Sequence, residues 1–284
     1  MNTLAIDIGG TKFTLALFEG QRMTRRESRP TDRESGREWM LEQIGRMASE
    51  WTRDRQIHRC GIGFGGPVDF AQQRVALSTH VGGWQEFPLS QYVQNLLGSV
   101  PTIMDNDANA GALGEARHGV GGALPLFYMT LSTGIGGGLI LSDGRVYRGA
   151  DSWAGEIGHL TVDPDGPECL CGARGCLERL CSGLWLERDY GRSARELLQD
   201  PAFVERYVVN LAQGMKAAVM LLNPAQLVIG GGIAKAGDAL FVPLRAELRR
   251  QMTRWSGARV EVVPARWGDD SVLWGALALA DASS

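Results

Sequence analysis

Apolar residues follow two different periods along this chain, and the change of period separates the expected helices from the expected strands. The clearest helical pattern covers residues 202–222, where apolar side chains recur at helical spacing until Asn223-Pro224 ends the helix. A second helical pattern covers residues 33–52. The closing segment DDSVLWGALALADA predicts a capped helix.

Apolar runs that stop at glycine predict the strands. The segments LAIDIGGTKFTLALFEGQ and LFYMTLSTGIGGGLILSDGR each predict a strand, a glycine turn and a second strand. HRCGIGFGGPVD, PTIMDN and AQLVIGGG add further strands. Because one hairpin begins each half of the chain, the pattern predicts an internally duplicated α/β fold with two lobes.

Composition and charge exclude several classes of protein. With 284 residues, 44% of them hydrophobic, the chain is long enough to bury two cores. Its 29 basic and 32 acidic residues give a net charge of -3, which argues against nucleic acid as a partner. No apolar run approaches the roughly 20 residues of a membrane helix, and MNTLAIDIGG lacks the features of a signal peptide. We therefore expect a cytoplasmic protein without a membrane partner.

Four of the five cysteines lie in one segment, HLTVDPDGPECLCGARGCLERLC, residues 159–181. In a reducing compartment such clustering favours a metal site over disulfides. Three thiolates and one imidazole suit tetrahedral Zn²⁺, and four protein ligands leave no position for water, so the metal would be structural. The alternative is a group of buried free thiols, but a loop rich in Gly, Pro, Asp and Glu offers them no core. The expected ligands are His159, Cys169, Cys171 and Cys176.

The neighbours of these ligands suggest what the loop is for. Gly172 and Gly175 would let the backbone fold tightly around the metal. Glu156 and Glu178 flank the cluster and would accept hydrogen bonds from a polyol, although solvated surface charges are the alternative interpretation. The remaining cysteines, Cys60 and Cys181, are expected to be packing residues.

Three glycine-rich turns, DIGGTK, STGIGGG and IGGGIAK, each follow a predicted strand. Glycine lets backbone N–H groups approach phosphate oxygens closely, so the three turns together predict a nucleotide between the lobes. Asp7 is placed to hold a hydrated Mg²⁺. Thr11 and Lys12 would add a hydroxyl and a charge near the phosphates. For Lys12, an exposed lysine on an edge strand is an equal alternative.

Asp107, in DNDANAGA, lies where a strand should end and a helix should begin. One interpretation makes it the N-cap of that helix. The other makes it a general base that orients and deprotonates an acceptor hydroxyl in phosphoryl transfer. Asp105 competes for this role, because residues two apart on a strand share one face unless a bend at Asn106 separates them.

Together, DIGGTK, GGPVD, NDAN, STGIGGG, AGEIGH, CxCGxxGCxE and the late IGGG resemble the ROK family of sugar kinases and related repressors over nearly the whole chain. The resemblance implies a two-lobed actin-like (ribonuclease-H-like) duplicated fold with a zinc-binding loop. It implies an N-terminal lobe of residues 1–113, rejoined by a helix at residues 269–284, and a C-terminal lobe of residues 114–268 with the zinc loop at residues 159–176.

The resemblance also implies an activity, the phosphorylation of a hexose hydroxyl by ATP. The 6-hydroxyl of glucose is the expected acceptor, with N-acetylmannosamine, fructose, mannose and allose as alternatives. The implied cofactors are ATP, Mg²⁺ and a structural Zn²⁺. Because members of the family are usually dimers or tetramers, we expect a homodimer that binds only small-molecule partners.

Individual residues take their roles from the resemblance. It makes Asp107 the catalytic base, which decides the competition with Asp105, and it gives His159 one ring nitrogen for zinc and the other for the sugar. The implied sugar-binding residues are Asn106, Glu156, His159, Glu178, Gly66 and His80. The implied nucleotide-binding residues are Asp7, Gly9, Gly10, Thr11, Lys12, Thr133, Gly134, Gly136, Gly137, Gly231 and Gly232.

Two positions depart from the family pattern. Gly65 stands where many members have proline, which should loosen the loop through the entropy of the unfolded chain. His80 stands where many sugar kinases have an asparagine that contacts the sugar. Either His80 contacts the sugar differently or it is a surface residue, so the departure leaves the identity of the sugar open.

Two functions of other classes are weighed against the kinase. Repressors of the family carry a helix-turn-helix segment before the kinase-like part, whereas DIGGTK here begins at residue 7, so a repressor is not expected. A sugar binder without activity is opposed by the intact Asp107 and the intact phosphate turns.

Overall fold

The computed structural model describes residues 1–53, 55–78, 81–254 and 256–282. The chain forms two compact units. The first consists of residues 1–118, 148–154 and 270–284, and the second of residues 119–147 and 155–269. Each unit has its own five-stranded sheet and its own hydrophobic core.

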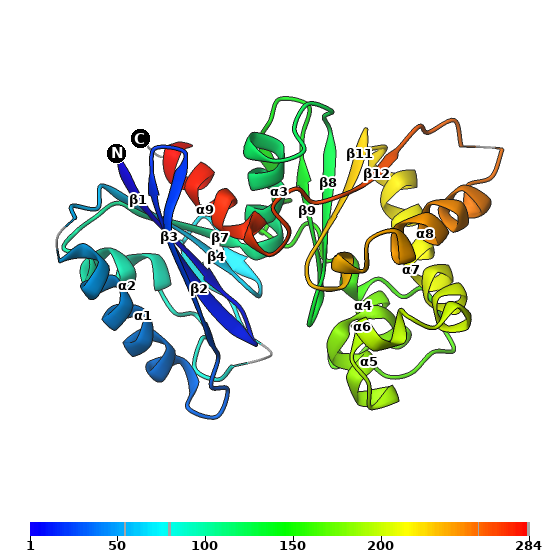
Figure 1. Ribbon diagram of the computed structural model, residues 1–284, viewed down its shortest axis with the longest axis horizontal. Helices are drawn as coiled ribbons and strands as arrows, with labels where there is room; N and C mark the ends of the chain where they lie inside the picture. Colours follow the sequence, from blue (N-terminus) through cyan, green and yellow to red (C-terminus); the bar gives the residue numbers. More distant parts are fainter. Residues whose placement is uncertain (54, 79–80, 255, 283–284) are drawn as a thin grey trace. The chain divides into compact units, whose positions relative to one another are not determined.

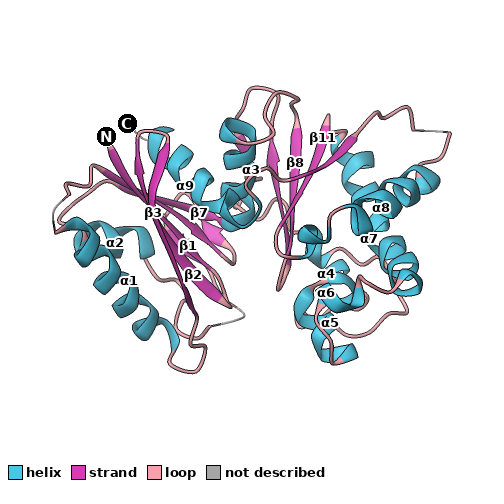
Figure 2. Ribbon diagram, in the orientation of Figure 1, coloured by secondary structure: helices cyan, strands magenta, loops and turns pink. Residues whose placement is uncertain are grey.

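The first unit is built on a mixed sheet with the strand order β3-β2-β1-β4-β7 (Figure 2). The strands β1, β2 and β3 form an antiparallel meander, while β4 and β7 continue the sheet parallel to β1. Buried side chains alternate little along β1 and β2, because helices cover both faces. The strands are β1 (Asn2–Ile8), β2 (Lys12–Glu19), β3 (Arg22–Pro30), β4 (Arg59–Phe64) and β7 (Thr102–Asn106). A small ribbon adds β5 (Val68–Asp69) and β6 (Arg74–Val75).

The second unit repeats this topology. Its strand order is β10-β9-β8-β11-β12, again with three antiparallel strands followed by two parallel ones. The strands are β8 (Leu126–Leu131), β9 (Ile135–Ile140), β10 (Val146–Tyr147), β11 (Gln226–Gly230) and β12 (Glu261–Pro264). The duplicated α/β fold predicted from the two glycine hairpins is therefore confirmed, and the hairpins are β1–β2 and β8–β9.

In the first unit, α1 and α2 cover one face of the sheet while α3 and α9 cover the other (Figure 1). The expected helix at residues 33–52 begins later, at Gly36, because the Asp32 side chain accepts the backbone N–H groups of Glu34 and Ser35 and so forms a turn first. The helices are α1 (Gly36–Thr52), α2 (Leu89–Leu96), α3 (Asp107–His118) and α9 (Ser271–Ala282).

The helices of the second unit begin with two short ones that follow the cysteine cluster. The longest, α7, is the helix predicted at residues 202–222, and it ends at Asn223 in the left-handed conformation. The helices are α4 (Leu177–Cys181), α5 (Gly183–Tyr190), α6 (Ala194–Leu197), α7 (Pro201–Leu222) and α8 (Asp238–Gln251). Short 3₁₀ turns cover Ile157–His159, Ile233–Ala236 and Gly268–Asp270. None of the helices in the described part of the chain has the length and hydropathy needed to cross a bilayer.

Helices α3 and α9 pack backbone against backbone. A Cβ at Gly275 would overlap the carbonyl oxygen of Ala110, and one at Gly114 would overlap that of Ser271. The Ser271 hydroxyl also lies 2.7 Å from the carboxylate of Glu115, and both side chains are fully buried. These contacts fix the axis of α3, the helix that begins at Asp107.

Replacing Gly275 by alanine should therefore destabilise the protein strongly. The added methyl group has no space unless the two helices separate, and overpacking of this kind costs about 2 kcal/mol or more. Chemical denaturation would measure the loss. Gly82→Ala is the matched control, because a Cβ at Gly82 meets no atom within 4 Å. Equal stability of the two variants would contradict the close packing.

Candidate active site and zinc centre

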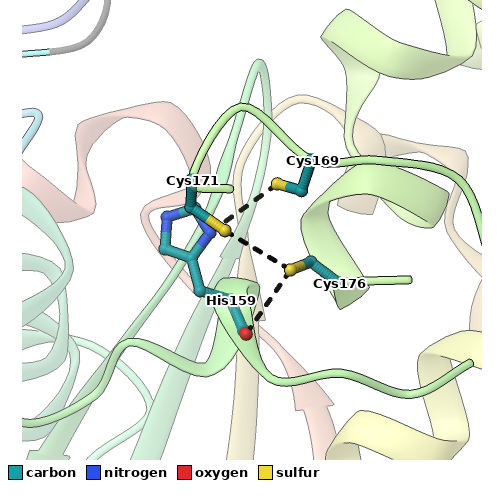
Figure 3. A group of neighbouring side chains, drawn as sticks. All are labelled: His159, Cys169, Cys171 and Cys176. Atoms are coloured by element: carbon teal, nitrogen blue, oxygen red, sulfur yellow. Dashed lines mark hydrogen bonds between the residues drawn. The ribbon is translucent and has the colours of Figure 1, made fainter. Parts of the chain in front are cut away.

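The four expected metal ligands form one cluster in the second unit, shown in Figure 3. One ligand atom from each of His159, Cys169, Cys171 and Cys176 lies within 4.8 Å of all the others. The sulfurs of Cys171 and Cys176 are 3.6 Å apart, and the sulfur of Cys169 is 4.0 Å from Nδ1 of His159. The other ring nitrogen of His159 lies on the side of the ring away from Cys176.

This donor set fits tetrahedral Zn²⁺. With Zn–S bonds of about 2.3 Å, two sulfurs of a tetrahedron lie about 3.8 Å apart, close to the observed separation. Burial, and hydrogen bonds that its thiol donates to Cys171 and Cys169, raise the pKa of Cys176 to about 12. Although burial opposes it, hydrogen bonds from the backbone of Ala173 and from Cys176 lower the pKa of Cys171. Metal binding would replace the remaining thiol protons.

Two glycines shape the cluster, as the sequence predicted. Gly172 and Gly175 have φ of 92° and 58°, values that favour glycine. The N–H of Gly172 donates to the carbonyl of Cys169, which closes the turn between Cys169 and Cys171. Cys181 and Cys60 lie outside the cluster and are fully buried, so their predicted role in packing is confirmed.

Glu156 lies next to this cluster because glycines let its loop approach strand β9. A Cβ at Gly155 would overlap the carbonyl of Gly137, and one at Gly158 would overlap that of Ile135. Burial raises the pKa of Glu156; His159 opposes the increase and the charge of Glu178 adds to it. Gly137, predicted to contact phosphate, thus also packs against the loop that carries Glu156.

Glu178 binds the turn of the β8–β9 hairpin. Its Oε2 accepts the backbone N–H of Ile135 at 2.8 Å and lies 2.8 Å from the place where a Cβ of Gly134 would be. The next segment completes the support, since the N–H groups of Gly183 and Leu184 donate to the carbonyls of Ser132 and Thr133. The predicted phosphate residues Thr133 and Gly134 are therefore held by the chain that directly follows Cys176.

In the first unit, the structure separates Asp105 from Asp107. Asp105 is 2% exposed and accepts Nε and Nη2 of Arg148 at 2.9 and 2.7 Å. Burial raises the pKa of Asp105, and the charge of Arg148 opposes this increase. Because its carboxylate is buried and paired, Asp105 is not placed to reach a substrate.

Asn106, not Asp107, caps helix α3. The Oδ1 of Asn106 accepts the N–H groups of Ala108 and Asn109 at 2.9 and 3.3 Å. Its Nδ2 donates to the carbonyl of Gly66, so this amide, predicted to bind sugar, already holds two segments together. The structure confirms a bend at Asn106, because β7 ends at this residue and α3 begins at Asp107.

Gly65 lies between Asp107 and the β1–β2 turn. A Cβ at Gly65 would lie 3.4 Å from Oδ2 of Asp107 and 3.4 Å from Cα of Gly9. The N–H of Gly65 donates to the carbonyl of Ile8 at 2.8 Å. Proline, which the family often has here, has no N–H for this bond, so Gly65 adds a contact as well as chain entropy.

The β1–β2 turn holds the first set of expected nucleotide residues. Asp7 is half-buried at the end of β1, and the N–H of Gly9 donates to the carbonyl of Lys12. Strand β2 lies between β1 and β3, so the alternative of an edge-strand lysine for Lys12 is wrong. Beyond these, the structure places Gly10 and Thr11 in the turn itself, Gly136 on β9, and Gly231 and Gly232 directly after β11.

Gly231 is required by its surroundings, because φ is 86° and a Cβ would overlap the carbonyl of Leu131. This contact joins the end of β11 to the β8–β9 turn. His80, the departure from the family pattern, lies outside the described residues.

Sequence reasoning missed the residues that support the turns. Thr31 donates its N–H to the carbonyl of Thr11 and its hydroxyl to that of Gly9, and Nε of Arg33 donates to that of Gly10 at 2.7 Å. Arg148 was missed as well. No motif contains these residues; only their contacts reveal them.

Comparison with known proteins identifies the family. The sequence profile of the ROK family matches residues 3–283. The chain belongs to the ROK family. It is 30% identical to a glucokinase of Thermotoga maritima over 98% of this chain and 97% of the relative, and 31% identical to an N-acetylmannosamine kinase of Citrobacter koseri over 99% of each.

A solved structure agrees with this assignment. The ROK family glucokinase of Streptomyces griseus, determined in complex with glucose and AMPPNP, has a TM-score of 0.86 and 26% identity, over 99% of this chain and all of the other. The recognition from the sequence motifs and the duplicated actin-like fold of the ROK family are thereby confirmed.

Removing one cysteine should release the metal. Cys171→Ser should leave the ROK protein without stoichiometric zinc and lower its Tm, because three ligands bind zinc less tightly than four. Elemental analysis of the purified protein would measure the zinc content. Cys181→Ala is the control, since this thiol lies outside the cluster. Full zinc occupancy in Cys171→Ser would contradict the proposed ligand set.

Glu156→Gln should raise the Tm at neutral pH. The pKa of Glu156 is raised on folding, so the folded state binds its proton more tightly and stability falls as pH rises through the raised pKa. The amide carries no charge and avoids this cost, so the gain should disappear at acidic pH. Calorimetry across the pH range would measure it, with the exposed Glu168→Gln as control. A gain that does not depend on pH would argue against this origin.

Proposed function

We propose that this sugar kinase transfers the γ-phosphate of ATP to the 6-hydroxyl of glucose, with Asp107 as the general base. The observation that carries the proposal is that Asp105, Asn106 and Asp107, at the end of β7, have different contacts. Asp105 is buried and paired with Arg148, and Asn106 caps the helix. Asp107 is the half-buried carboxylate beside Gly9 and Gly65, where its Oδ1 also accepts the backbone N–H of Ala108 at 2.8 Å. The likeness to glucokinases, one of them solved with glucose and AMPPNP, supports glucose and ATP as substrates.

In the proposed reaction, Asp107 accepts the proton of the sugar hydroxyl. The hydroxyl oxygen then bonds to the γ-phosphorus, the bond to the β-phosphate oxygen breaks, and ADP leaves. Backbone N–H groups of the β1–β2 and β8–β9 turns would bind the phosphates. Asp7 would hold the Mg²⁺ that neutralises their charge, and Lys12 would add a positive charge.

Glu156, His159 and Glu178 would bind the sugar hydroxyls from the second unit. Nδ1 of His159 faces the thiols, which leaves the other ring nitrogen for a hydroxyl. The oxygen of Glu178 that is not bonded to Ile135 could accept a second hydroxyl. When bound, zinc would hold this loop rigid without taking part in the reaction. Sugar contacts by Gly66 and His80, and a homodimer in the cytoplasm, stay predictions.

A second candidate substrate is N-acetylmannosamine, because the likeness to N-acetylmannosamine kinases is as extensive as that to glucokinases. To decide, ADP release should be measured with MgATP and a panel of hexoses and N-acetylhexosamines, using zinc-loaded protein. We expect the highest kcat/KM with glucose. A lead for N-acetylmannosamine would replace the substrate but keep the kinase. No turnover with any sugar would favour a sugar-binding protein without activity.

Asp107→Asn should lower kcat by about 100- to 10,000-fold, the usual contribution of a general base. Sugar binding should persist, because other residues provide most of the contacts. Calorimetric titration with the sugar and steady-state kinetics would measure the two effects. Asp143→Asn, at an exposed carboxylate, is the control. Turnover near wild type in Asp107→Asn would show that another group is the base.

A further inference from the structure

The segment of residues 148–154 belongs to the first unit, although the chain on both sides of it belongs to the second. Two contacts with Phe70 hold it there. The Ser152 hydroxyl accepts the backbone N–H of Phe70 at 3.2 Å, and the Arg148 guanidinium lies 3.5 Å from the centre of the Phe70 ring. The N–H of Ala154 donates to the carbonyl of Arg148, which closes the segment on itself.

Arg148 points its guanidinium at one carboxylate oxygen. Its Nε and Nη2 both donate to Oδ2 of Asp105, at 2.9 and 2.7 Å. Two donors and a stacked ring fix the orientation of the planar group, which lysine could not reproduce fully. The side chain of Asp105 is 2% exposed and that of Arg148 21% exposed, so the pair is largely removed from solvent.

The second oxygen of Asp105 links the Arg148 pair to helix α3 through hydrogen bonds. Oδ1 accepts the backbone N–H of Asn106 at 2.8 Å and Nδ2 of Asn109 at 3.0 Å. These two residues stand on either side of Asp107 in the sequence. One buried carboxylate thus joins Arg148 to the turn from which the proposed base projects.

We infer that Arg148 is a positioning residue, which acts through Asp105 to hold Asp107 in the place that phosphoryl transfer requires. The inference rests on the proposed function of Asp107. Without Arg148, the buried Asp105 carboxylate would lack its cation and would have to take up a proton or admit water. Either change alters its bonds to Asn106 and Asn109, and so moves Asp107.

Replacing Arg148 should lower kcat. A displacement of about 1 Å at a reacting group can cost about 100-fold in rate. Arg148→Met should therefore lower kcat by about 10- to 100-fold, while the KM values for sugar and ATP stay near those of the wild type. Arg148→Lys keeps the charge and should recover part of the loss. Arg145→Met is the matched control, because Arg145 lies only three residues away, on the other side of β10, with its side chain 79% exposed.

A double variant tests whether the effect passes through Asp105. Asp105→Asn combined with Arg148→Met removes both charges and leaves no buried unpaired carboxylate. If Arg148 acts through Asp105, the double variant should lose no more kcat than Arg148→Met alone. All assays should be run well below the Tm of each zinc-loaded variant. Should Arg148→Met fold poorly, kcat of Arg148→Lys should instead be compared with kcat of the double variant.

Three outcomes would overturn the inference. The first is a kcat for Arg148→Met equal to that of Arg145→Met. The second is a loss confined to KM, which would make Arg148 a binding residue. The third is additive losses in the double variant. Asp107→Asn assayed in parallel separates the two proposals: if it is inactive while Arg148→Met is normal, only this inference fails, and if it stays active, the proposed base is wrong.

Discussion

Close approach of one stretch of backbone to another, which only glycine permits, is the constraint on which both units depend. In the first unit, Gly114 and Gly275 let α3 and α9 pack without side chains between them. In the second, Gly137, Gly155 and Gly158 bring the loop that carries Glu156 onto strand β9. Gly137, which the sequence predicted to bind phosphate, therefore also determines where Glu156 can lie.

Buried or half-buried carboxylates also stabilise points where the chain turns. Asp105 and Glu178 both accept backbone N–H groups at points where the chain turns, Asp105 at the start of α3 and Glu178 at the β8–β9 hairpin. Such bonds fix backbone geometry. Both oxygens of Asp105 are used in hydrogen bonds, whereas Glu178 uses only Oε2 for the backbone. Asp107 also accepts a backbone N–H, that of Ala108, so burial and the ion pair with Arg148 are what distinguish Asp105 from the proposed base.

The zinc loop connects these features in the second unit. From Cys176 the chain runs directly into α4, which carries Glu178, and then into α5, whose first N–H groups bind the carbonyls of the hairpin turn. His159 ends the loop that rests on β9. A metal at this cluster would therefore order the proposed sugar-binding residues and a proposed phosphate turn together.

The sequence alone determined the duplicated fold, the cluster of one histidine and three cysteines, and the family, because hydrophobic period, glycine position and cysteine spacing are local properties of the chain. It could not distinguish Asp105 from Asp107 as the base without a resemblance. The one helix cap that it suggested was Asp107, whereas Asn106 holds that place. It also gave no sign of Arg148, which lies 43 residues from its partner Asp105. Only the tertiary structure decided these roles, because a side chain's function here depends on which distant groups donate to it, and folding brings those groups together.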